Sequence, residues 1–411
     1  MIRALSLFFT LLISNSVYAE TVKSTVVLLS VDGFSYDYLQ KYKPKNILNF
    51  AKSGVSAPLL PVYPSKTFPN HLSIITGAYP VNHGIIHNRF YHPELNQKYH
   101  LSAGKENATW ITADPFWSVA EENSIKSAVY FWPESQALGH TPPTYNIPYN
   151  KIVTNKARFK QLIKWLKLPS AERPHFLVGY FSTVDSAGHH YGIDSPQITS
   201  EIRKFDVLFG DFLEKISNEI DQPINIILVS DHGMTPIKKE ATIFTEATFK
   251  YIDIKSDGIT VTYSDTQLFF YFDKTKVSKE TQLNIEKQLK LNQLENEKPY
   301  SVYSKGNYPE RWHFNADVEI VPNIILEAKA PASFSNKANP TVFNGATHGY
   351  DPKYNRQLDG LFIAAGTDIT QNKIIKPFQN IHIFPLMNKL LGLKEHEGID
   401  GKQQVLESII K

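Results

Sequence analysis

Apolar and polar positions along this chain alternate in blocks that are typical of a sheet covered by helices. Short apolar runs that end in Gly, Ser or Asp predict buried strands, and the segments between them carry the periodicity of amphipathic helices. The predicted strands lie at residues 24–33, 127–132, 175–185, 224–233 and 360–366. The predicted helices lie near residues 38–52, 156–167, 197–220 and 382–391. This alternation predicts an α/β fold with a mainly parallel sheet and helices on both of its faces.

A segment in the second half of the chain departs from this pattern. From about residue 235 to residue 344, runs of alternating polarity such as "GITVTYS" and "LFFYF" flank one amphipathic helix near residues 279–291. This pattern predicts a small α+β subdomain, residues 235–344, inserted between two strands of the main sheet. The main α/β domain would then consist of residues 20–234 and 345–411.

The first 19 residues carry the pattern of a secretory signal peptide. Arg3 gives a basic start, Leu5 to Ile13 form an apolar core, and cleavage is expected near Ala19. The alternative, an N-terminal membrane anchor, needs a longer apolar run. No later stretch is apolar over a sufficient length to cross a membrane. We therefore expect a periplasmic or secreted protein.

Composition narrows the class of protein. The chain has 411 residues and no cysteine, so its core must be stable without disulfides, which is ordinary at this length. Exported animal proteins of this size usually carry disulfides, so a bacterial source is expected. The net charge of +3 is spread along the chain without a basic tail or patch, which argues against a nucleic-acid-binding surface. Oligomeric state is left open.

Acidic residues and histidines follow two of the predicted strands. "LLSVDG" places Asp32 directly after an apolar run, and "LVSDHG" places Asp231 and His232 in the same position. In an open α/β sheet, ligands bind beyond the carboxyl ends of the strands. Each Asp alone could instead cap the following turn. Two matching cases favour a site.

Two further segments supply candidates of the same kind. Asp185 and His189 lie four residues apart, on the expected turn after the third strand, and at that spacing a carboxylate and an imidazole can meet one cation. The adjacent His190 would point elsewhere. His348 lies between Gly345 and Gly349 in a predicted loop, where it is either a surface residue or a ligand.

Taken together, these candidates are three carboxylates and three imidazoles without a thiolate. This mixture suits Zn²⁺, leaves Mn²⁺ or Fe open, and disfavours Ca²⁺. Six ligands exceed the three that a single catalytic zinc usually takes. They suit two metal ions about 3.5–4 Å apart, the arrangement that stabilises the attacking and leaving oxygens in phosphoryl transfer.

A threonine at a predicted helix start is the candidate nucleophile. In "KTFPNH", Thr67 suits an N-cap and Pro69 suits the first turn. Capping alone accounts for this stretch. Beside two metal ions, however, a hydroxyl among free N–H groups at the positive end of a helix is also suited to nucleophilic attack on a phosphate.

The set of motifs resembles the nucleotide pyrophosphatase/phosphodiesterase family of the alkaline phosphatase superfamily. The matching stretches occur in the family's order: "VDGF" at Val31, "PSKTFPNHLSIITGAYPVNHGI" at Pro64, "NRF" at Asn88, "FWP" at Phe131, "LPSAERPHF" at Leu168, "DSAGHHYG" at Asp185, "SDHGM" at Ser230 and "THGYDP" at Thr347. Each is weak alone, but the set is specific. The resemblance implies an alkaline phosphatase-like fold.

The resemblance also implies a site with two Zn²⁺ per chain. It gives one ligand set of Asp185, His189 and His348, and a second of Asp32, Asp231 and His232, with Thr67 bound to the second ion as nucleophile. Asn88 would join the Thr67 backbone N–H in donating to a phosphoryl oxygen. The implied mechanism is in-line attack by threonine, a covalent threonyl ester, and hydrolysis with net retention at phosphorus.

The residues around the metal site would select the substrate. Phe68 follows the nucleophile, and Tyr149 lies in "NIPYNK", where similar nucleotide-acting family members carry an aromatic residue. Together they could sandwich a nucleobase, a contact worth about 1–3 kcal/mol per base. Alternatively, Tyr149 only packs at the rim of the sheet. We expect a nucleotide pyrophosphatase/phosphodiesterase that releases nucleoside 5′-monophosphate.

Other functions stay open. The first alternative is a choline-phospholipid phosphodiesterase with the same metal site, whose quaternary ammonium would need an aromatic cage or a carboxylate. A phosphonate hydrolase is another. A phosphomonoesterase is disfavoured because no Arg lies beside Thr67. A binding protein with an inactive metal site, or a structural protein held by metal, is also disfavoured because every ligand and nucleophile position carries a suitable residue.

Overall fold

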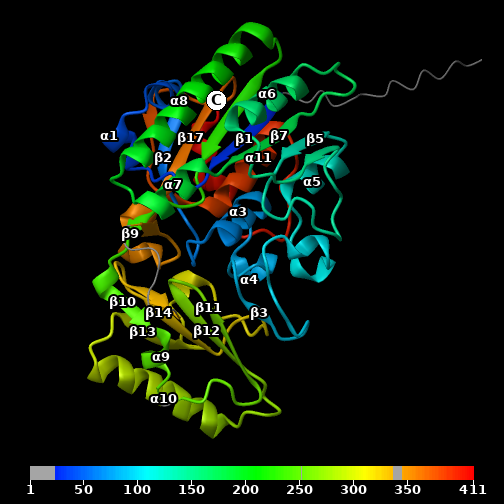
Figure 1. Ribbon diagram of the computed structural model, residues 1–411. Coiled ribbons are helices and arrows are strands. Elements are labelled where there is room, and N and C mark those ends of the chain that lie inside the picture. The colour runs from blue at the N-terminus through cyan, green and yellow to red at the C-terminus, as the bar shows by residue number, and fades with distance from the viewer. Residues whose placement is uncertain (1–23, 251, 337–344) are drawn as a thin grey trace, which may run out of the picture.

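The computed structural model describes residues 24–250, 252–336 and 345–411, so the predicted signal peptide lies outside the described residues. Its main sheet has nine strands, eight of them in the order β18-β2-β17-β8-β1-β7-β5-β6, with β19 also paired to β2 (Figure 1). The strands are β1 (Thr25–Val31), β2 (Val55–Leu60), β5 (Ser127–Tyr130), β6 (Tyr145–Ile147), β7 (Phe176–Phe181), β8 (Ile224–Val229), β17 (Gly360–Gly366), β18 (Lys373–Ile374) and β19 (Phe378–Gln379). Only β17 runs antiparallel to its neighbours β2 and β8 within this sheet. The predicted mainly parallel sheet is confirmed.

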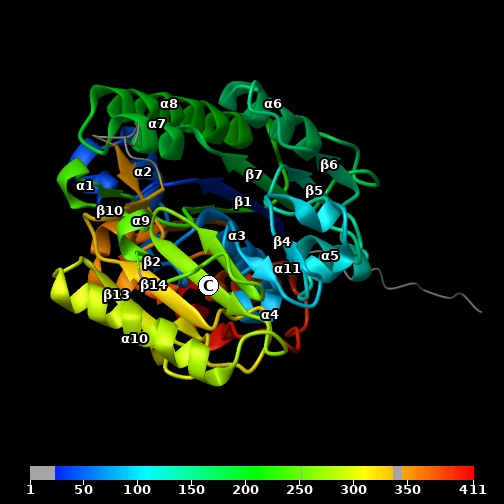
Figure 2. The same cartoon turned by 60° about the horizontal axis from the view of Figure 1, so that its bottom comes forward.

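Helices cover both faces of this sheet (Figure 2). One face carries α1 (Tyr38–Tyr42), α2 (Lys45–Lys52), α6 (Asn155–Leu166), α7 (Thr183–Tyr191) and α8 (Pro196–Glu219); the other carries α3 (Thr67–Thr76), α5 (Phe116–Glu122) and α11 (Ile383–Leu391). The pleat of the central strand explains the two layers, because Val27 and Leu29 pack with the first set of helices whereas Val26 and Leu28 pack with the second. Among the described residues, no helix combines the length and the apolar composition needed to span a bilayer.

A second sheet lies apart from the first, at the bottom of Figure 1. It is antiparallel in the order β11-β12-β14-β13 and lies within the segment that was predicted as an insertion. Its strands are β11 (Ile259–Tyr263), β12 (Gln267–Phe272), β13 (Tyr300–Ser304) and β14 (Ile324–Ala328). Alternate residues face two layers: Leu268 and Phe270 pack with helix α10 (Lys279–Glu295), whereas Phe269 and Tyr271 join a cluster that includes Phe68 of α3. The exact domain boundaries stay a prediction.

Short elements complete the chain. They are the strand pairs β3 (Tyr91–His92) with β4 (Gln97–Lys98), β9 (Thr235–Pro236) with β16 (Ala346–Thr347), and β10 (Thr242–Phe244) with β15 (Ser333–Ser335), and the helices α4 (Pro80–His83) and α9 (Thr245–Thr248). The pair β9–β16 joins the two ends of the inserted segment to each other.

Two local expectations were wrong. The helix predicted at residues 38–52 is divided into α1 and α2, because Lys43 adopts a left-handed conformation and Pro44 cannot continue a helix. The stretch "DSAGHH" was expected to be a turn but forms part of α7. Its Gly188 allows close packing instead, since a Cβ atom there would lie 2.2 Å from Met234 Sδ.

Candidate metal centre and active site

Three neighbouring parallel strands bring the predicted site residues to one edge of the sheet. Strand β1 lies between β7 and β8, and all three run in the same direction. Asp32 directly follows β1, and Asp231 and His232 follow β8. Helix α7 begins just beyond β7 and carries Asp185 and His189 on the same helical face, one turn apart. The carboxyl ends of the strands therefore gather these five side chains.

One cluster contains Asp32, Asp231 and His232. His232 Nε2 lies 3.0 Å from Asp231 Oδ2 and 3.5 Å from Asp32 Oδ1. All three side chains are almost completely buried. Their ligand atoms lie close enough together to hold one metal ion.

A second cluster contains Asp185, His189 and His348. His189 Nε2 lies 3.4 Å from Asp185 Oδ1 and 3.2 Å from His348 Nε2, and the remaining distance, from His348 Nε2 to Asp185 Oδ1, is 3.8 Å. The rings of His348 and His232 stack with their centroids 3.6 Å apart, so the two clusters are contiguous. The structure thus brings together the two triplets that the resemblance implied, although their role as metal ligands stays a prediction.

Backbone carbonyls orient the three imidazole rings. The Nδ1 atoms of His189, His232 and His348 lie 3.0, 2.9 and 2.8 Å from the carbonyl oxygens of Ala346, Gly233 and Ser65, respectively. Because a carbonyl only accepts, each Nδ1 must carry the proton and donate. In the neutral ring, Nε2 then presents a lone pair toward the cluster. This tautomer is the one that a metal ligand requires.

The carboxylates fit a metal ion for a separate reason. Asp32 Oδ1, Asp185 Oδ1 and Asp231 Oδ2 are buried and, among the described residues, make no hydrogen bond. Buried polar atoms are nearly always paired, and these three oxygens face the histidine Nε2 atoms. Three unpaired carboxylate oxygens and three imidazole lone pairs form a donor set suited to Zn²⁺.

The pKa values of Asp32 and Asp231, the two acids of the first cluster, are shifted in opposite directions. Burial raises the pKa of Asp32 well above its usual range, and repulsion from Asp231 and Asp185 raises it further. Burial also acts to raise the pKa of Asp231, but the neighbouring His232 and His71 outweigh burial and hold that pKa well below its usual range. Adjacent carboxylates with opposite shifts are typical of a functional site.

Burial and neighbouring charges also shift the pKa values of His232 and His348. Burial acts to lower the pKa of His232, but Asp231 outweighs burial and raises it. Burial lowers the pKa of His348 well below its usual range, and the positive charges of His232 and Lys66 add to this effect. His348 is therefore neutral at physiological pH, as a ligand must be.

Thr67 lies beside the first cluster, with its Oγ1 atom 3.2 Å from His232 Nε2. The expectation that Thr67 caps α3 was wrong: Lys66 occupies the N-cap with an extended backbone, and Thr67 is the first helical residue. Its N–H therefore lies in the first turn, outside the helical hydrogen-bond ladder. Asn88 Oδ1 accepts a hydrogen bond of 3.0 Å from the N–H of Phe68, which holds Asn88 beside the start of the helix.

Sequence reasoning missed two residues that support this centre. His71, one helical turn after Thr67, is fully buried, and its Nδ1 lies 2.8 Å from Thr67 O and 3.3 Å from Asp231 Oδ2. The Tyr180 hydroxyl donates to Asp32 Oδ2. For His71 a signal was present, since it closes the "TFPNH" motif at the spacing of a helical turn. Tyr180 lies inside an apolar strand that gave no signal.

The two predicted substrate-binding aromatics differ in exposure. Tyr149 is 43% exposed, and its hydroxyl lies 3.2 Å from Ser182 Oγ, next to the start of α7. Its ring lies 6.1 Å from that of Tyr180, which places it on the Asp32 side of the centre. Phe68 is only 7% exposed, since most of its ring packs in the cluster that the inserted sheet also joins. The sandwich of a base between Tyr149 and Phe68 stays a prediction.

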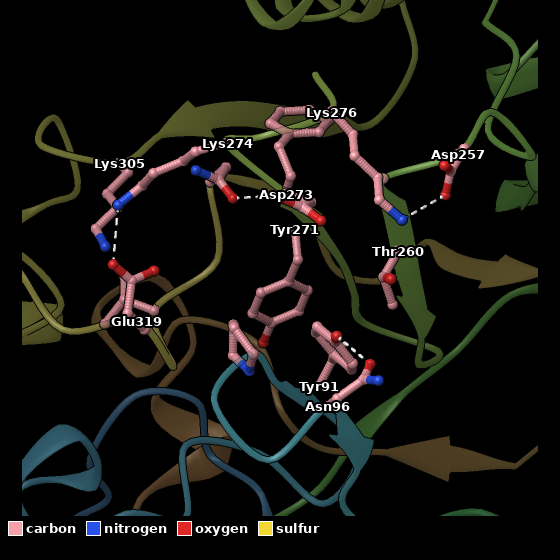
Figure 3. Close-up of a pocket in the computed structure, with 15 residues that line it drawn as sticks. Tyr91, Asn96, Asp257, Thr260, Tyr271, Asp273, Lys274, Lys276, Lys305 and Glu319 are labelled. Atoms are coloured by element: carbon pink, nitrogen blue, oxygen red, sulfur yellow. Dashed lines mark hydrogen bonds and ion pairs between the residues drawn. The ribbon is translucent and has the colours of Figure 1, made fainter. Parts of the chain in front are cut away.

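A cavity of about 530 Å³ lies away from this centre (Figure 3). It is formed where β11 and β12 meet the hairpin of β3 and β4, with Asp257, Tyr271 and Lys276 among its lining residues. The turn that joins β11 to β12 lies at the opposite ends of these strands and contacts Lys66 through Asp265. None of the predicted site residues is among those that line the cavity.

Comparisons with known sequences show the family of this chain. Residues 26–351 match the family model described as type I phosphodiesterase / nucleotide pyrophosphatase. An uncharacterized pyrophosphatase/phosphodiesterase of Schizosaccharomyces pombe is 31% identical over 90% of this chain and 77% of its own length. Ectonucleotide pyrophosphatase/phosphodiesterase family member 3 of Bos taurus is 33% identical, and venom phosphodiesterase of Naja atra is 31% identical. The chain spans only 42% and 45% of the length of these last two proteins.

Solved structures share the fold. Murine ectonucleotide pyrophosphatase/phosphodiesterase 5 superimposes with a TM-score of 0.82 at 25% identity, over 94% of this chain and all of that one. The human counterpart gives a TM-score of 0.83 at 25% identity, with the same coverage.

Proposed function

This chain belongs to the type I phosphodiesterase / nucleotide pyrophosphatase family, and we propose that it hydrolyses phosphodiester or pyrophosphate bonds of nucleotides and releases nucleoside 5′-monophosphate. The nucleotide class follows from the relatives, whose names describe pyrophosphatase/phosphodiesterase activity. The observation that carries the proposal is the position of Thr67 Oγ1, 3.2 Å from His232 Nε2 at the start of a buried helix.

Two Zn²⁺ would be held by the two clusters. Asp185, His189 and His348 would bind one ion, and Asp32, Asp231 and His232 the other. When bound, the ions would supply Lewis-acid stabilisation of the phosphoryl oxygens and lower the pKa of the attacking hydroxyl. The orientation of the three imidazoles and the three unpaired carboxylate oxygens support this assignment.

Thr67 would act as the nucleophile. After its proton passes to water, Oγ1 would form a bond to phosphorus as the bond to the leaving oxygen breaks in line. Water would then hydrolyse the threonyl ester, which restores the Thr67 hydroxyl and releases the nucleoside 5′-monophosphate. Two such displacements retain the configuration at phosphorus. The Thr67 N–H and the amide of Asn88 would donate to a nonbridging oxygen, because fixed donors stabilise charge as it develops. Asn88 can do so because its Oδ1 atom is fixed by the Phe68 N–H, which leaves its NH₂ group to donate.

The substrate would be selected by aromatic contacts. Tyr149 is 43% exposed beside Ser182, so its ring would contact a nucleobase, and Phe68, which is 7% exposed, would pack against the other side of the base. The choline-phospholipid alternative is not favoured, since the relatives are described by nucleotide pyrophosphatase and phosphodiesterase activity.

We also propose that the chain is exported, because its first 19 residues carry the pattern of a secretory signal peptide.

A hydrolysis assay tests the reaction and the nucleophile together. The protein, supplied with Zn²⁺, would be compared on p-nitrophenyl thymidine 5′-monophosphate, p-nitrophenylphosphocholine and p-nitrophenyl phosphate. We expect preference for the nucleotide ester and a loss of roughly 10⁴-fold or more in kcat for Thr67→Ala, as when other enzymes lose their nucleophile. Preference for phosphocholine would overturn the substrate class, and activity that survives in Thr67→Ala would overturn the threonyl intermediate.

A further inference from the structure

The turn between β11 and β12 reaches from the inserted sheet into the proposed metal centre. Asp265, in this turn, accepts a hydrogen bond at Oδ2 from the Thr347 hydroxyl. Two residues further, Gln267 Nε2 donates to the carbonyl of Gly349 at 2.6 Å. Thr347 and Gly349 flank His348, so the inserted sheet holds a residue on each side of this histidine, Thr347 through its hydroxyl and Gly349 through its carbonyl.

The other oxygen of the same carboxylate is bound to the residue before Thr67. Lys66 Nζ lies 2.7 Å from Asp265 Oδ1 and donates a second hydrogen bond of 2.8 Å to the carbonyl of His348. Lys66 is 5% exposed, so its ammonium is almost completely withdrawn from water and depends on these acceptors.

The packing around Lys66 allows little movement. A Cβ atom at Gly349 would lie 2.2 Å from Lys66 Cε, and Gly349 has a φ of +115°, which disfavours any other residue. Ser65 adds to the fixed geometry, because its Oγ accepts from the Gly349 N–H at 2.9 Å. The loop that carries His348 and the strand end that leads into α3 are therefore locked together.

We propose that Asp265 is a positioning residue that fixes the proposed nucleophile and a proposed metal ligand relative to each other. Its two oxygens hold Lys66, which precedes Thr67, and Thr347, which precedes His348. The two segments are far apart in the sequence, and one carboxylate from the inserted sheet holds both of them, in addition to the direct contacts that Ser65 and Lys66 make with the loop of His348. This inference rests on the proposed function and assigns a catalytic purpose to the inserted segment.

Asp265→Ala tests the proposal through metal binding as well as activity. We expect one of two Zn²⁺ equivalents to bind about tenfold more weakly, as is typical when support for a metal ligand is lost, and kcat to fall by a similar factor with little change in KM. Zn²⁺ affinity and stoichiometry would be measured by competition with a chromophoric chelator. Asp265→Asn, which keeps one acceptor oxygen in place, should recover part of both losses.

Asp257→Ala is the matched control. Asp257 lies in the turn just before β11 of the same sheet, at the end opposite to Asp265, and its carboxylate pairs with Lys276 at 3.1 Å (Figure 3). Its loss should leave Zn²⁺ affinity and kcat at wild-type values. In a double variant of Asp265→Ala and Lys66→Met, the fold-loss should be smaller than the product of the two single fold-losses, because both substitutions remove the contact between Lys66 and Asp265 although each also removes one contact of its own.

The outcomes separate this inference from the proposed function. A wild-type protein that neither binds Zn²⁺ nor hydrolyses a nucleotide ester would overturn the proposed function. A wild-type protein that does both, with an Asp265→Ala variant of unchanged Zn²⁺ affinity and kcat, would overturn the positioning role alone. If Asp265→Ala does not fold, Thr347→Val removes only the hydroxyl that donates to Asp265, and unchanged Zn²⁺ affinity in that variant would also overturn the role.

Discussion

The Oγ1 atom of Thr67 lies 3.2 Å from His232 Nε2, and the carbonyl of the same residue lies 2.8 Å from His71 Nδ1. His71 thus connects the first turn of α3 to the acid that follows β8, because its Nδ1 also lies 3.3 Å from Asp231 Oδ2. Its other nitrogen, Nε2, lies 2.8 Å from Ser30 Oγ, which donates to it. At the scale of single residues, a fully buried side chain therefore helps to fix the backbone of the residue that carries the proposed nucleophile.

Substitution of His71 tests this connection. His71→Leu leaves the hydroxyl of Ser30 without its acceptor and removes the imidazole that contacts the Thr67 carbonyl and Asp231 Oδ2. We therefore expect the free energy of unfolding to fall by about 1–3 kcal/mol. We expect kcat to fall about tenfold, as is typical when a contact that supports a metal ligand is lost. His71→Asn retains a donor near the Nδ1 position and should keep more of the activity. Thermal unfolding and initial rates would measure both effects, and equal kcat values for the two variants would argue against a role for the Nδ1 donor.

At the scale of secondary-structure elements, the site depends on how closely the segment after β8 approaches its neighbour. Gly233 follows His232, and a Cβ atom at this position would lie 2.0 Å from the carbonyl oxygen of Gln357. The carbonyl of Gly233 also orients His232 by accepting from its Nδ1. The glycine therefore allows the approach of two backbones and sets the position of an imidazole.

Gly233→Ala should accordingly affect stability and metal binding together. Because the contact is with backbone rather than with a flexible side chain, we expect destabilisation by about 1–3 kcal/mol or more, with weaker Zn²⁺ binding. Gly306→Ala is the control, since a Cβ atom there meets nothing within 4 Å and only its φ of +86° is unfavourable. Chemical denaturation would compare them. A smaller loss at Gly233 than at Gly306 would contradict the steric argument.

Some of the elements that carry the site could be predicted from the sequence, and others could not. The strands before Asp32 and Asp231 were predictable because a buried parallel strand is a short, almost purely apolar run. That Asp185 and His189 lie in a helix could not be predicted, because Gly188 between them is typical of a turn unless the residue packed against it is known. In this case the partner is Met234, which lies 46 residues further along the chain.

At the scale of the whole molecule, the least predictable contacts are those between the inserted sheet and the main domain. Lys66 and Asp265 are separated by 199 positions, and neither lies in a periodic pattern. The fold class and the six clustered acids and histidines could be predicted because each depends on local pattern or on motif. The connection from the insertion to the site could not, because a surface-like Lys and Asp acquire a role only when tertiary structure brings them together.

Removal of metal tests whether Asp32 destabilises the metal-free protein and stabilises the metal-bound one. Without metal, Asp32 is a buried carboxyl group that Asp231 and Asp185 repel. Asp32→Asn removes this repulsion and keeps an acceptor for the Tyr180 hydroxyl, so the variant should unfold at a temperature about 2–5 °C higher than wild type in EDTA. With Zn²⁺ the order should reverse, because a ligand at 100 times its Kd stabilises the folded state by about 2.7 kcal/mol and the variant lacks a ligand.

The reversal in the order of the two unfolding temperatures, between EDTA and Zn²⁺, discriminates between a metal centre and a structural cluster of acids. Calorimetry of both proteins in EDTA and in excess Zn²⁺ gives four unfolding temperatures, and Asp257→Ala should follow wild type in both conditions because Asp257 is 82% exposed and pairs only with Lys276 in the described part of the chain. If Asp32→Asn were less stable than wild type under both conditions, the buried acids would stabilise the fold directly. The reversal is expected because the same repulsion that destabilises the metal-free protein is what a divalent cation relieves.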